Sequence, residues 1–290
     1  MSHRPRRSAL YMPAANVRAV EKARGLNCDV VILDLEDAVL PELKDEARAA
    51  AVAAVRAGGF GRREVVIRVN ALDTPWGEAD LAAAVQAGPD AVIAPKIRNP
   101  GDVATYQSRL SAARRETRLW LMIETPQAIL RLDQIAGVGG RLAGLVVGLN
   151  DLAKEMRARS TPERTPFLPA LALIVTAARA HGLLALDGVH NEIEDLGLLE
   201  RTCGQGAEIG FDGRTLIHPS HLEICNRAYT PPQSEIAWAR AVIDAFEAPE
   251  NAGRGALRVA GRLAERLHLD EARRLVAIAE ALASATVSAA

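Results

Sequence analysis

The sequence predicts a (β/α)8 barrel followed by a C-terminal helical extension. Short runs rich in Val, Ile and Leu recur along the chain, and longer segments with helical periodicity separate them. Several runs are apolar at successive positions, as in Val30–Leu33. Such runs are typical of strands that are buried on both faces in a parallel sheet covered by helices. Eight of them in about 220 residues indicate eight βα units.

The predicted strands follow one another in the first three quarters of the chain. An open, doubly wound sheet is the main alternative, but it usually carries a glycine-rich phosphate loop after its first strand. Pro13–Asn16, which follows the first apolar run, is not such a loop. The strands are predicted over Ser8–Met12, Asp29–Leu35, Glu64–Val69, Asp90–Pro95, Leu119–Ile123, Ala143–Val147, Leu183–Leu186 and Ala207–Phe211.

The segments between the strands supply the helices. Lys44–Ala57 repeats Ala and Val on one helical face with charged residues on the other, and Leu168–Ala180 has a similar period. Glycines are expected to end helical segments, because a left-handed C-terminal residue is least costly for glycine. The glycines expected in this role are Gly25, Gly58, Gly59, Gly88, Gly182 and Gly204.

The sequence changes character after the last predicted strand. A turn-rich break at Tyr229–Gln233 separates a predicted barrel domain, residues 1–228, from an extension, residues 229–290. About 60 residues cannot build a separate core, so we expect the extension to pack on the barrel or on a neighbouring subunit. Its predicted elements are a helix over Ser234–Ala248 with Ser234 as N-cap, a loop over Pro249–Gly255 and a helix from about Leu269 to Ala283.

Composition excludes several classes of partner. The 35 basic and 36 acidic residues leave a net charge of -1, so no global field would recruit nucleic acid or a membrane surface.

Cys28, Cys203 and Cys225 lack metal-ligand spacing and are typical of reduced intracellular thiols. The run Leu142–Leu149 is far shorter than the ~20 residues of a membrane span, and Pro13 leaves no room for a secretory signal. We therefore expect a cytoplasmic protein.

Polar residues follow seven of the eight predicted strands. Barrel enzymes build their active sites at the C-terminal ends of the strands, so these residues are expected to converge on one mouth. A solvated loop residue is the alternative for any one of them. The residues are Asp34, Glu36, Asp37, Arg68, Asn70, Lys96, Glu124, Thr125, Asn150, Asp151, Asp187, Asp212 and Arg214.

Glu124 and Asp151 form the candidate metal pair. They follow successive predicted strands, and Mg²⁺ is typically held by one or two carboxylates with water and substrate oxygens. The lack of a His/Cys cluster argues against zinc. Arg68 is the natural clamp for a substrate carboxylate, since its fork donates two parallel hydrogen bonds. Arg68 pairing with Glu36 or Asp37 inside the mouth is the alternative, and the two roles are compatible.

An ordered set of motifs resembles the citrate lyase β-subunit-like group of the HpcH/HpaI aldolase family. The resemblance runs from about residue 7 to residue 270 and independently implies a (β/α)8 barrel with a Mg²⁺ site. The motifs are Leu33–Val39 followed by Lys44 and Ala47-Arg48, Arg68-Val69-Asn70, Pro95-Lys96, Ile123-Glu124-Thr125, Gly148–Leu152, Gly210–Arg214 and Ile217-His218-Pro219.

The resemblance implies cleavage or formation of the carbon–carbon bond between a 2-oxo acid and an acyl-CoA enolate, as in citryl-CoA, malyl-CoA and citramalyl-CoA lyases. It implies Mg²⁺ on Glu124 and Asp151, and the oxo-acid carboxylate on Arg68. It also implies that backbone amides of the Gly148-Leu149-Asn150 turn complete the carboxylate site. Relatives form trimers or hexamers that exchange the C-terminal segment, so a homo-oligomer is expected.

The proton donor departs from the family pattern. Relatives associate the acid step with an Asp in a C-terminal lid from the adjacent subunit, whereas this chain has Gly261–Glu265 in that segment. We interpret Glu265 as the general acid, with a plain surface carboxylate as the alternative. Because a displacement of about 1 Å can cost ~10²-fold in rate, the replacement of Asp by Glu leaves open which thioester this protein uses. It also leaves open whether the protein uses a thioester.

Other residues near the mouth receive weaker interpretations. Lys96 could bind a phosphate or carboxylate, or neutralise the acidic mouth. Arg214 could bind CoA phosphates, and Asp187 could lie behind the metal ligands. His218, next to Pro219, is expected to form a structural hydrogen bond.

Three alternatives to a CoA-thioester lyase stay open. A CoA-independent aldolase acting on a 4-hydroxy-2-oxo acid could use the same metal and Arg68. A citrate lyase β subunit would need an acyl-carrier partner. A non-catalytic ligand-binding protein is the alternative least compatible with keeping Arg68, Glu124 and Asp151 together.

Overall fold

The structure, a computed structural model, describes residues 4–287 and the side chains up to residue 284. Two compact units divide the chain between Tyr229 and Thr230. Residues 6–229 form the barrel unit. The segment from Thr230 onward, with Arg4 and Pro5, forms the C-terminal unit.

Eight parallel strands close into a barrel in chain order, because β1 pairs with both β2 and β8. The predicted (β/α)8 fold is therefore confirmed. The strands are β1 (Ser8–Pro13), β2 (Val30–Asp34), β3 (Glu64–Arg68), β4 (Ala91–Ala94), β5 (Arg118–Ile123), β6 (Leu142–Val147), β7 (Leu184–Asp187) and β8 (Gly213–Leu216).

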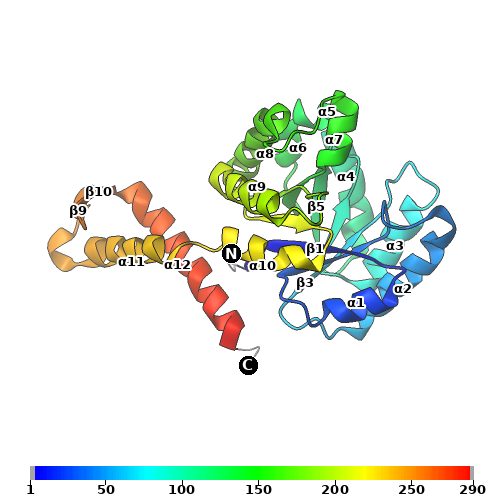
Figure 1. Ribbon diagram of the computed structural model, residues 1–290, viewed down its shortest axis with the longest axis horizontal. Helices are drawn as coiled ribbons and strands as arrows, with labels where there is room; N and C mark the ends of the chain where they lie inside the picture. The colour runs from blue at the N-terminus through cyan, green and yellow to red at the C-terminus, as the bar shows by residue number, and fades with distance from the viewer. Residues whose placement is uncertain (1–3, 288–290) are drawn as a thin grey trace. The chain divides into compact units, whose positions relative to one another are not determined.

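Helices between the strands cover the outside of the barrel. In Figure 1, α5 to α9 (green to yellow-green) lie together on one side of the barrel unit, and α1 to α3 (blue to cyan) lie on another. The helices are α1 (Val17–Ala23), α2 (Lys44–Ala57), α3 (Gly77–Ala87), α4 (Pro100–Arg109), α5 (Pro126–Ile129), α6 (Leu132–Ala136), α7 (Leu149–Met156), α8 (Leu168–Ala180), α9 (Leu196–Ile209) and α10 (Leu222–Ala228).

Alternate residues of strands β1 to β7 enter two separate cores. In β2, Val31 and Leu33 pack with the core between sheet and helices. Val30 and Ile32 pack with the smaller core inside the barrel, which also contains Trp120. Both faces of the strand are therefore apolar, which explains the uninterrupted hydrophobic runs that predicted the fold.

The predicted eighth strand is wrong. Ala207–Ile209 forms the last turn of α9, which ends at Gly210 with φ 106°, and β8 begins only at Gly213. Phe211 is buried in the core between sheet and helices, so the apolar run reflects the buried end of a helix. Gly204, expected to end a helix, lies inside α9.

Asp212 therefore precedes a strand instead of following one. Its carboxylate accepts a hydrogen bond from the Ala185 amide at 2.8 Å and pairs with Arg179 Nη1 at 2.9 Å. Both contacts lie at the barrel end opposite the mouth, because Asp212 leads into β8 and Ala185 lies early in β7. The prediction that Asp212 joins the polar residues of the mouth is wrong.

The C-terminal unit contains a hairpin that the sequence analysis did not predict. Its elements are α11 (Gln233–Glu247), β9 (Ala256–Val259), β10 (Arg262–Glu265) and α12 (Arg266–Val287). β9 and β10 pair antiparallel across a turn in which Ala260 and Gly261 have φ of 46° and 81°. Pro232, not Ser234, occupies the N-cap of α11.

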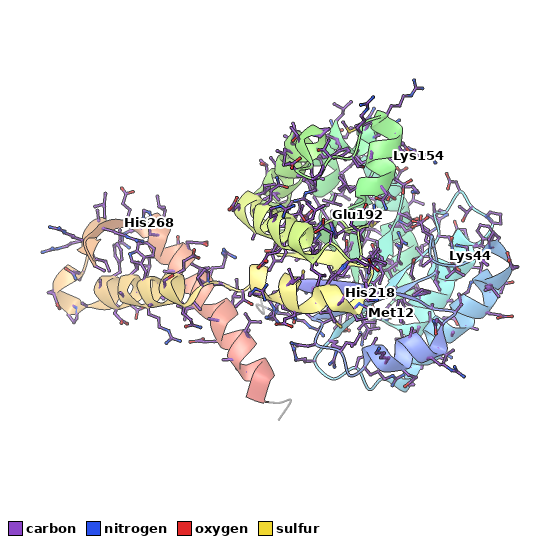
Figure 2. The ribbon with its side chains drawn as sticks, in the orientation of Figure 1. Met12, Lys44, Lys154, Glu192, His218 and His268 are labelled. Atoms are coloured by element: carbon purple, nitrogen blue, oxygen red, sulfur yellow. The ribbon has the colours of Figure 1, made fainter. Side chains whose placement is uncertain are left out.

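A small apolar core holds the C-terminal unit together, so the expectation that this extension cannot build a core of its own is wrong. The core joins Ala239 and Val242 of α11 to Leu257 of β9 and Leu269 of α12. The Trp238 and His268 rings meet edge-to-face with centroids 6.0 Å apart, and Figure 2 labels His268 where α12 begins. Among the described residues, no helix has the length and apolar character needed to cross a membrane.

Candidate active site

Arg68 and Asp34 form a bidentate ion pair at the mouth of the barrel. They are register partners at the ends of β3 and β2. Arg68 Nε and Nη2 donate to the two oxygens of Asp34 at 2.6 and 2.7 Å, and the guanidinium stacks 4.6 Å from the centre of the Tyr11 ring. Asp34 therefore fixes the plane of the guanidinium, and only the Nη1 edge is left for other partners.

Glu36 and Asp37 meet the remaining edge of Arg68. Nη1 lies 2.7 Å from Glu36 Oε2 and 3.2 Å from Asp37 Oδ2. Glu36 is buried, whereas Asp37 is 66% exposed at its side chain. Burial, opposed by Arg68 and assisted by the charges of Glu124 and Asp37, raises the pKa of Glu36 to about 8.

Lys44 holds the loop that carries Glu36. Its ammonium is buried and donates to the carbonyl oxygens of Leu35 and Glu36 at 2.7 Å each, and to Asn70 Oδ1 at 2.8 Å. Asn70 Nδ2 in turn donates to the Leu35 carbonyl at 2.8 Å. Two side chains from α2 and from the end of β3 therefore satisfy the backbone of one buried turn.

The Glu124 side chain lies so close to Gly148 that only glycine fits at that position. Glu124 follows β5, and its side chain is 1% exposed. A Cβ at Gly148 would overlap the Cβ and Oε2 of Glu124. The backbone amide of Lys96 donates to Glu124 Oε1 at 2.7 Å. Three consecutive strand ends, after β4, β5 and β6, therefore fix this carboxylate.

The Lys96 ammonium bridges the two carboxylates of the candidate metal pair. It forms an ion pair with Asp151 Oδ2 and lies 3.6 Å from Glu124 Oε1. Burial, opposed by the Lys96 charge and amide, raises the pKa of Glu124 to about 7. Burial opposes a charged Lys96, but Glu124 and Asp151 outweigh it and raise the Lys96 pKa.

This carboxylate pair fits a hard divalent cation. A single cationic group already contacts both side chains, so their oxygens converge on a common point. Within residues 4–287, no three His, Cys, Asp or Glu side chains form a metal cluster. The protein would thus supply two carboxylates and leave the other positions to water and substrate, which is the typical arrangement for Mg²⁺.

The first turn of α7 begins beside Glu124. Gly148 is the N-cap of this helix, and its amide donates to the Ile123 carbonyl at 3.1 Å. The amides of Leu149 and Asn150 occupy the first turn, where a helix offers unsatisfied donors. Asn150 and Asn191 exchange side-chain hydrogen bonds at 2.8 and 3.3 Å, which fixes the start of α7 against the loop after β7.

Asp187 and Arg214 belong to a separate buried cluster. Arg164 Nη1 donates to both oxygens of Asp187 at 2.8 and 2.7 Å, and Arg214 Nη1 lies 3.8 Å from Asp187 Oδ2. Arg214 is 1% exposed and also donates to Thr202 Oγ1 at 2.9 Å. Its proposed contact with CoA phosphates is therefore wrong, because the guanidinium is buried, and Asp187 is committed to two arginines.

The remaining predicted residues lie as follows. His218 Nδ1 contacts Ser220 Oγ at 2.7 Å and caps a short turn after β8, as expected for a structural histidine. Glu265 is the last residue of β10, has an exposed side chain and donates its backbone amide to His268 Nδ1 at 2.9 Å. Its role as general acid stays a prediction.

The roles of Asp34 and Lys44 are what the sequence does not reveal. Both lie in the predicted signature, but their roles depend on strand register and on burial of the loop after β2. The presence of a lysine eight residues after Glu36, within an apolar helix face, was the available signal for Lys44.

Comparison with known proteins places these features in a family. The family model for HpcH/HpaI aldolase/citrate lyase matches residues 7–219. The chain is 43% identical over 286 residues to a (3S)-malyl-CoA thioesterase of Cereibacter sphaeroides strain KD131, covering 98% of this chain and 99% of that protein. It is 34% identical over 284 residues to the citrate lyase subunit beta of Escherichia coli K12, covering 96% and 94%.

Solved structures agree with the sequence relatives. CitE from Mycobacterium tuberculosis, solved in complex with magnesium, acetoacetate and coenzyme A, superposes with a TM-score of 0.74 at 28% identity, covering 96% of this chain and 99% of that chain. The matches in sequence and in structure cover the barrel with its mouth residues. The chain therefore belongs to the HpcH/HpaI aldolase/citrate lyase family, in its citrate lyase β-subunit-like group.

Proposed function

We propose that this protein is a Mg²⁺-dependent enzyme that cleaves or forms the carbon–carbon bond between a 2-oxo acid and an acyl-CoA enolate. The observation that carries the proposal is the convergence of Glu124 and Asp151 on one cationic group. Arg68 lies near enough to lower the Glu124 pKa. A metal-binding pair beside a buried arginine suits a substrate that carries an oxygen ligand and a carboxylate.

Glu124 and Asp151 would hold Mg²⁺, which when bound polarises the substrate oxygen that alternates between hydroxyl and carbonyl. The solved CitE structure that contains magnesium supports this cofactor. Arg68 Nη1 and the amides of Leu149 and Asn150 would bind the carboxylate of the oxo acid. Because Asp34 already fixes the guanidinium plane, little reorganisation is needed when substrate arrives.

The residues around the metal pair would also control protons. Glu36 has a pKa of about 8, so it holds a proton at neutral pH beside the carboxylate site. In the cleavage direction, the substrate hydroxyl would pass its proton to water as the carbon–carbon bond breaks, and the departing enolate carbon would gain one. We assign the second proton to Glu265, on a lid provided by a neighbouring copy in a trimer or hexamer.

Thioester hydrolysis is the second candidate. The (3S)-malyl-CoA thioesterases of Cereibacter sphaeroides, at 43% identity over 98% of this chain, favour it. In both cases the enzyme would bind a hydroxyacyl-CoA thioester at the mouth of the barrel. The two reactions differ in the bond that breaks, because hydrolysis requires water at the thioester carbonyl, whereas the lyase reaction leaves the thioester intact.

A product assay separates the two reactions. The protein is incubated with Mg²⁺ and a panel of malyl-, citramalyl- and citryl-CoA, and the products are identified by mass spectrometry. The lyase proposal predicts an intact acyl-CoA and a 2-oxo acid, which for malyl-CoA are acetyl-CoA and glyoxylate. Free CoA and malate would instead establish the thioesterase, and turnover of 4-hydroxy-2-oxo acids without CoA would establish the aldolase.

A further inference from the structure

The Lys96 ammonium occupies the point on which the two candidate metal ligands converge. It pairs with Asp151 Oδ2, and its distance of 3.6 Å from Glu124 Oε1 is within ion-pair range. The Lys96 side chain is only 26% exposed. A divalent cation held by both carboxylates would need the same oxygens, so the two cations would repel each other at this distance.

The backbone amide of Lys96 forms a hydrogen bond of its own, separate from the ion pairs of the side chain. Lys96 has φ 55°, a left-handed conformation that is strained for a residue with a Cβ. Its amide donates to Glu124 Oε1 at 2.7 Å and so compensates this strain. The long side chain can therefore move while the amide continues to orient Glu124.

A third acidic group acts on the same ammonium. Glu36 acts on Lys96 electrostatically, in addition to Glu124 and Asp151, and the ammonium lowers the Glu36 pKa in return. Glu36 in turn contacts Arg68 Nη1 at 2.7 Å, so Lys96 acts on the part of the mouth where a substrate carboxylate would bind.

We propose that Lys96 is an internal counter-ion of the metal site, whose ammonium holds Glu124 and Asp151 together and is displaced when a divalent cation binds between them. The inference rests on the proposed assignment of Glu124 and Asp151 as metal ligands. Displacement keeps the local charge balanced, since one cation replaces another beside the carboxylates.

The test measures metal affinity directly, with Mn²⁺ as probe, by electron paramagnetic resonance and with Mg²⁺ as competitor. Lys96→Met removes the competing charge, and we expect Mn²⁺ to bind about tenfold more tightly. Lys154→Met is the matched control. Lys154 is exposed on α7, three residues from Asp151, so its substitution should leave the affinity nearly unchanged (Figure 2). Unchanged or weaker Mn²⁺ binding by Lys96→Met would overturn the proposal.

Glu124→Gln separates failure of this inference from failure of the proposed function. If the wild-type protein binds Mn²⁺ and Glu124→Gln does not, Glu124 is a metal ligand and the Lys96 result can be judged alone. If Glu124→Gln binds Mn²⁺ as tightly as the wild type, the assigned metal site is wrong and the inference falls with it.

A second measurement uses the wild-type protein and does not depend on folding of the variant. Lysine acylation by acetic anhydride is followed by mass spectrometry with and without saturating Mg²⁺. We expect acylation of Lys96 to become at least about threefold faster with Mg²⁺, because the ammonium leaves its two carboxylates, while Lys154 acylation stays constant. An equal or slower rate at Lys96 would contradict displacement.

Discussion

At the scale of single residues, Arg68 derives its orientation from Asp34. Both the Nε and Nη2 donors of its guanidinium are used by this one carboxylate. Removing one partner of a buried ion pair costs about 3–5 kcal/mol, because the other charge is left unpaired. Arg68 is therefore a structural group of the barrel end as well as the proposed carboxylate ligand.

Arg68→Lys tests this double role. Lysine keeps the charge but loses the fork, so we expect the free energy of unfolding to fall by about 1–3 kcal/mol and kcat/KM to fall about a hundredfold. Urea denaturation and steady-state kinetics measure the two effects. Arg179→Lys is the control, since Arg179 pairs with Asp212 in a half-exposed position; equal effects of the two substitutions would contradict the account.

Glu36 should make stability depend on pH. Its pKa is raised from 4.5 to about 8, so the folded protein binds a proton that the unfolded chain has lost. Stability from this group is present below pH ~4.5 and is lost as pH rises through ~8, and we expect a loss of about 1–3 kcal/mol. Glu36→Gln should abolish this decline in unfolding measurements from pH 5 to 9 with a chelator present.

Glu42→Gln provides the control for that experiment. Glu42 is exposed in the same loop, so its substitution should leave the pH profile of the wild-type protein in place. Parallel profiles for Glu36→Gln and the wild type would show that Glu36 is ionised in the folded protein at neutral pH.

The sequence predicts which residues lie at the mouth better than it predicts which of them pair with each other. The contact of Arg68 with Glu36 and Asp37 was one of the two alternatives, and it is present. The pairing with Asp34 cannot be predicted from the sequence alone, because it depends on the register between β2 and β3. A shift of one residue in register would place a different pair of side chains together.

At the scale of elements, the turn between β2 and α2 depends on Lys44. Its ammonium satisfies two carbonyl oxygens and the Asn70 side chain in a buried position. Each buried acceptor left without a donor costs about 1–3 kcal/mol, so Lys44→Met should lower the free energy of unfolding by about 3 kcal/mol or more. Lys22→Met, on the exposed face of α1, should change it little in the same urea titration.

Gly148 sets the distance between the start of α7 and Glu124. A Cβ there would overlap the Glu124 side chain, so Gly148→Ala should weaken Mn²⁺ binding at least about tenfold while the barrel stays folded. Gly204→Ala is the contrasting substitution. It places a Cβ in open space inside α9 and should stabilise the protein by about 0.5–1 kcal/mol. Unaltered metal binding by Gly148→Ala would contradict the proposed ligand geometry.

The wrong position of strand eight has a physical cause. Ala207–Phe211 is apolar because the end of α9 and the following turn are buried, and a short apolar run does not distinguish a strand from such a helix end. β8 itself, Gly213–Leu216, carries the polar Arg214 and Thr215 in buried positions. Its sequence therefore lacks the hydrophobic pattern that identified the other strands.

At the scale of the whole molecule, the sequence predicted the closed barrel but not the hairpin of the C-terminal unit. Strands β9 and β10 have four residues each, and a four-residue strand in a charged segment gives little periodic signal. The turn at Ala260-Gly261 is left-handed at both positions, where Asn-Gly would be the recognisable pair. The hairpin ends at Glu265 and leads directly into α12.

Complementation tests the proposed role of Glu265 in a neighbouring copy. Glu265→Ala and Glu124→Gln should each abolish turnover, since one removes the proposed acid and the other a metal ligand. When the two variants are unfolded, mixed and refolded together, mixed oligomers pair an intact lid with an intact mouth. We expect turnover to reappear in the mixture, and its absence despite mixed oligomers would contradict an exchanged lid.

The most direct test of the account is the metal dependence of 2-oxo acid release from a malyl-type CoA thioester. We predict that the wild-type protein releases glyoxylate and acetyl-CoA from malyl-CoA only with Mg²⁺. Chelation, or Glu124→Gln, should lower the rate at least about a hundredfold. Release of the 2-oxo acid that continues unchanged after complete removal of the metal would contradict the assignment of Glu124 and Asp151 and the proposed function built on them.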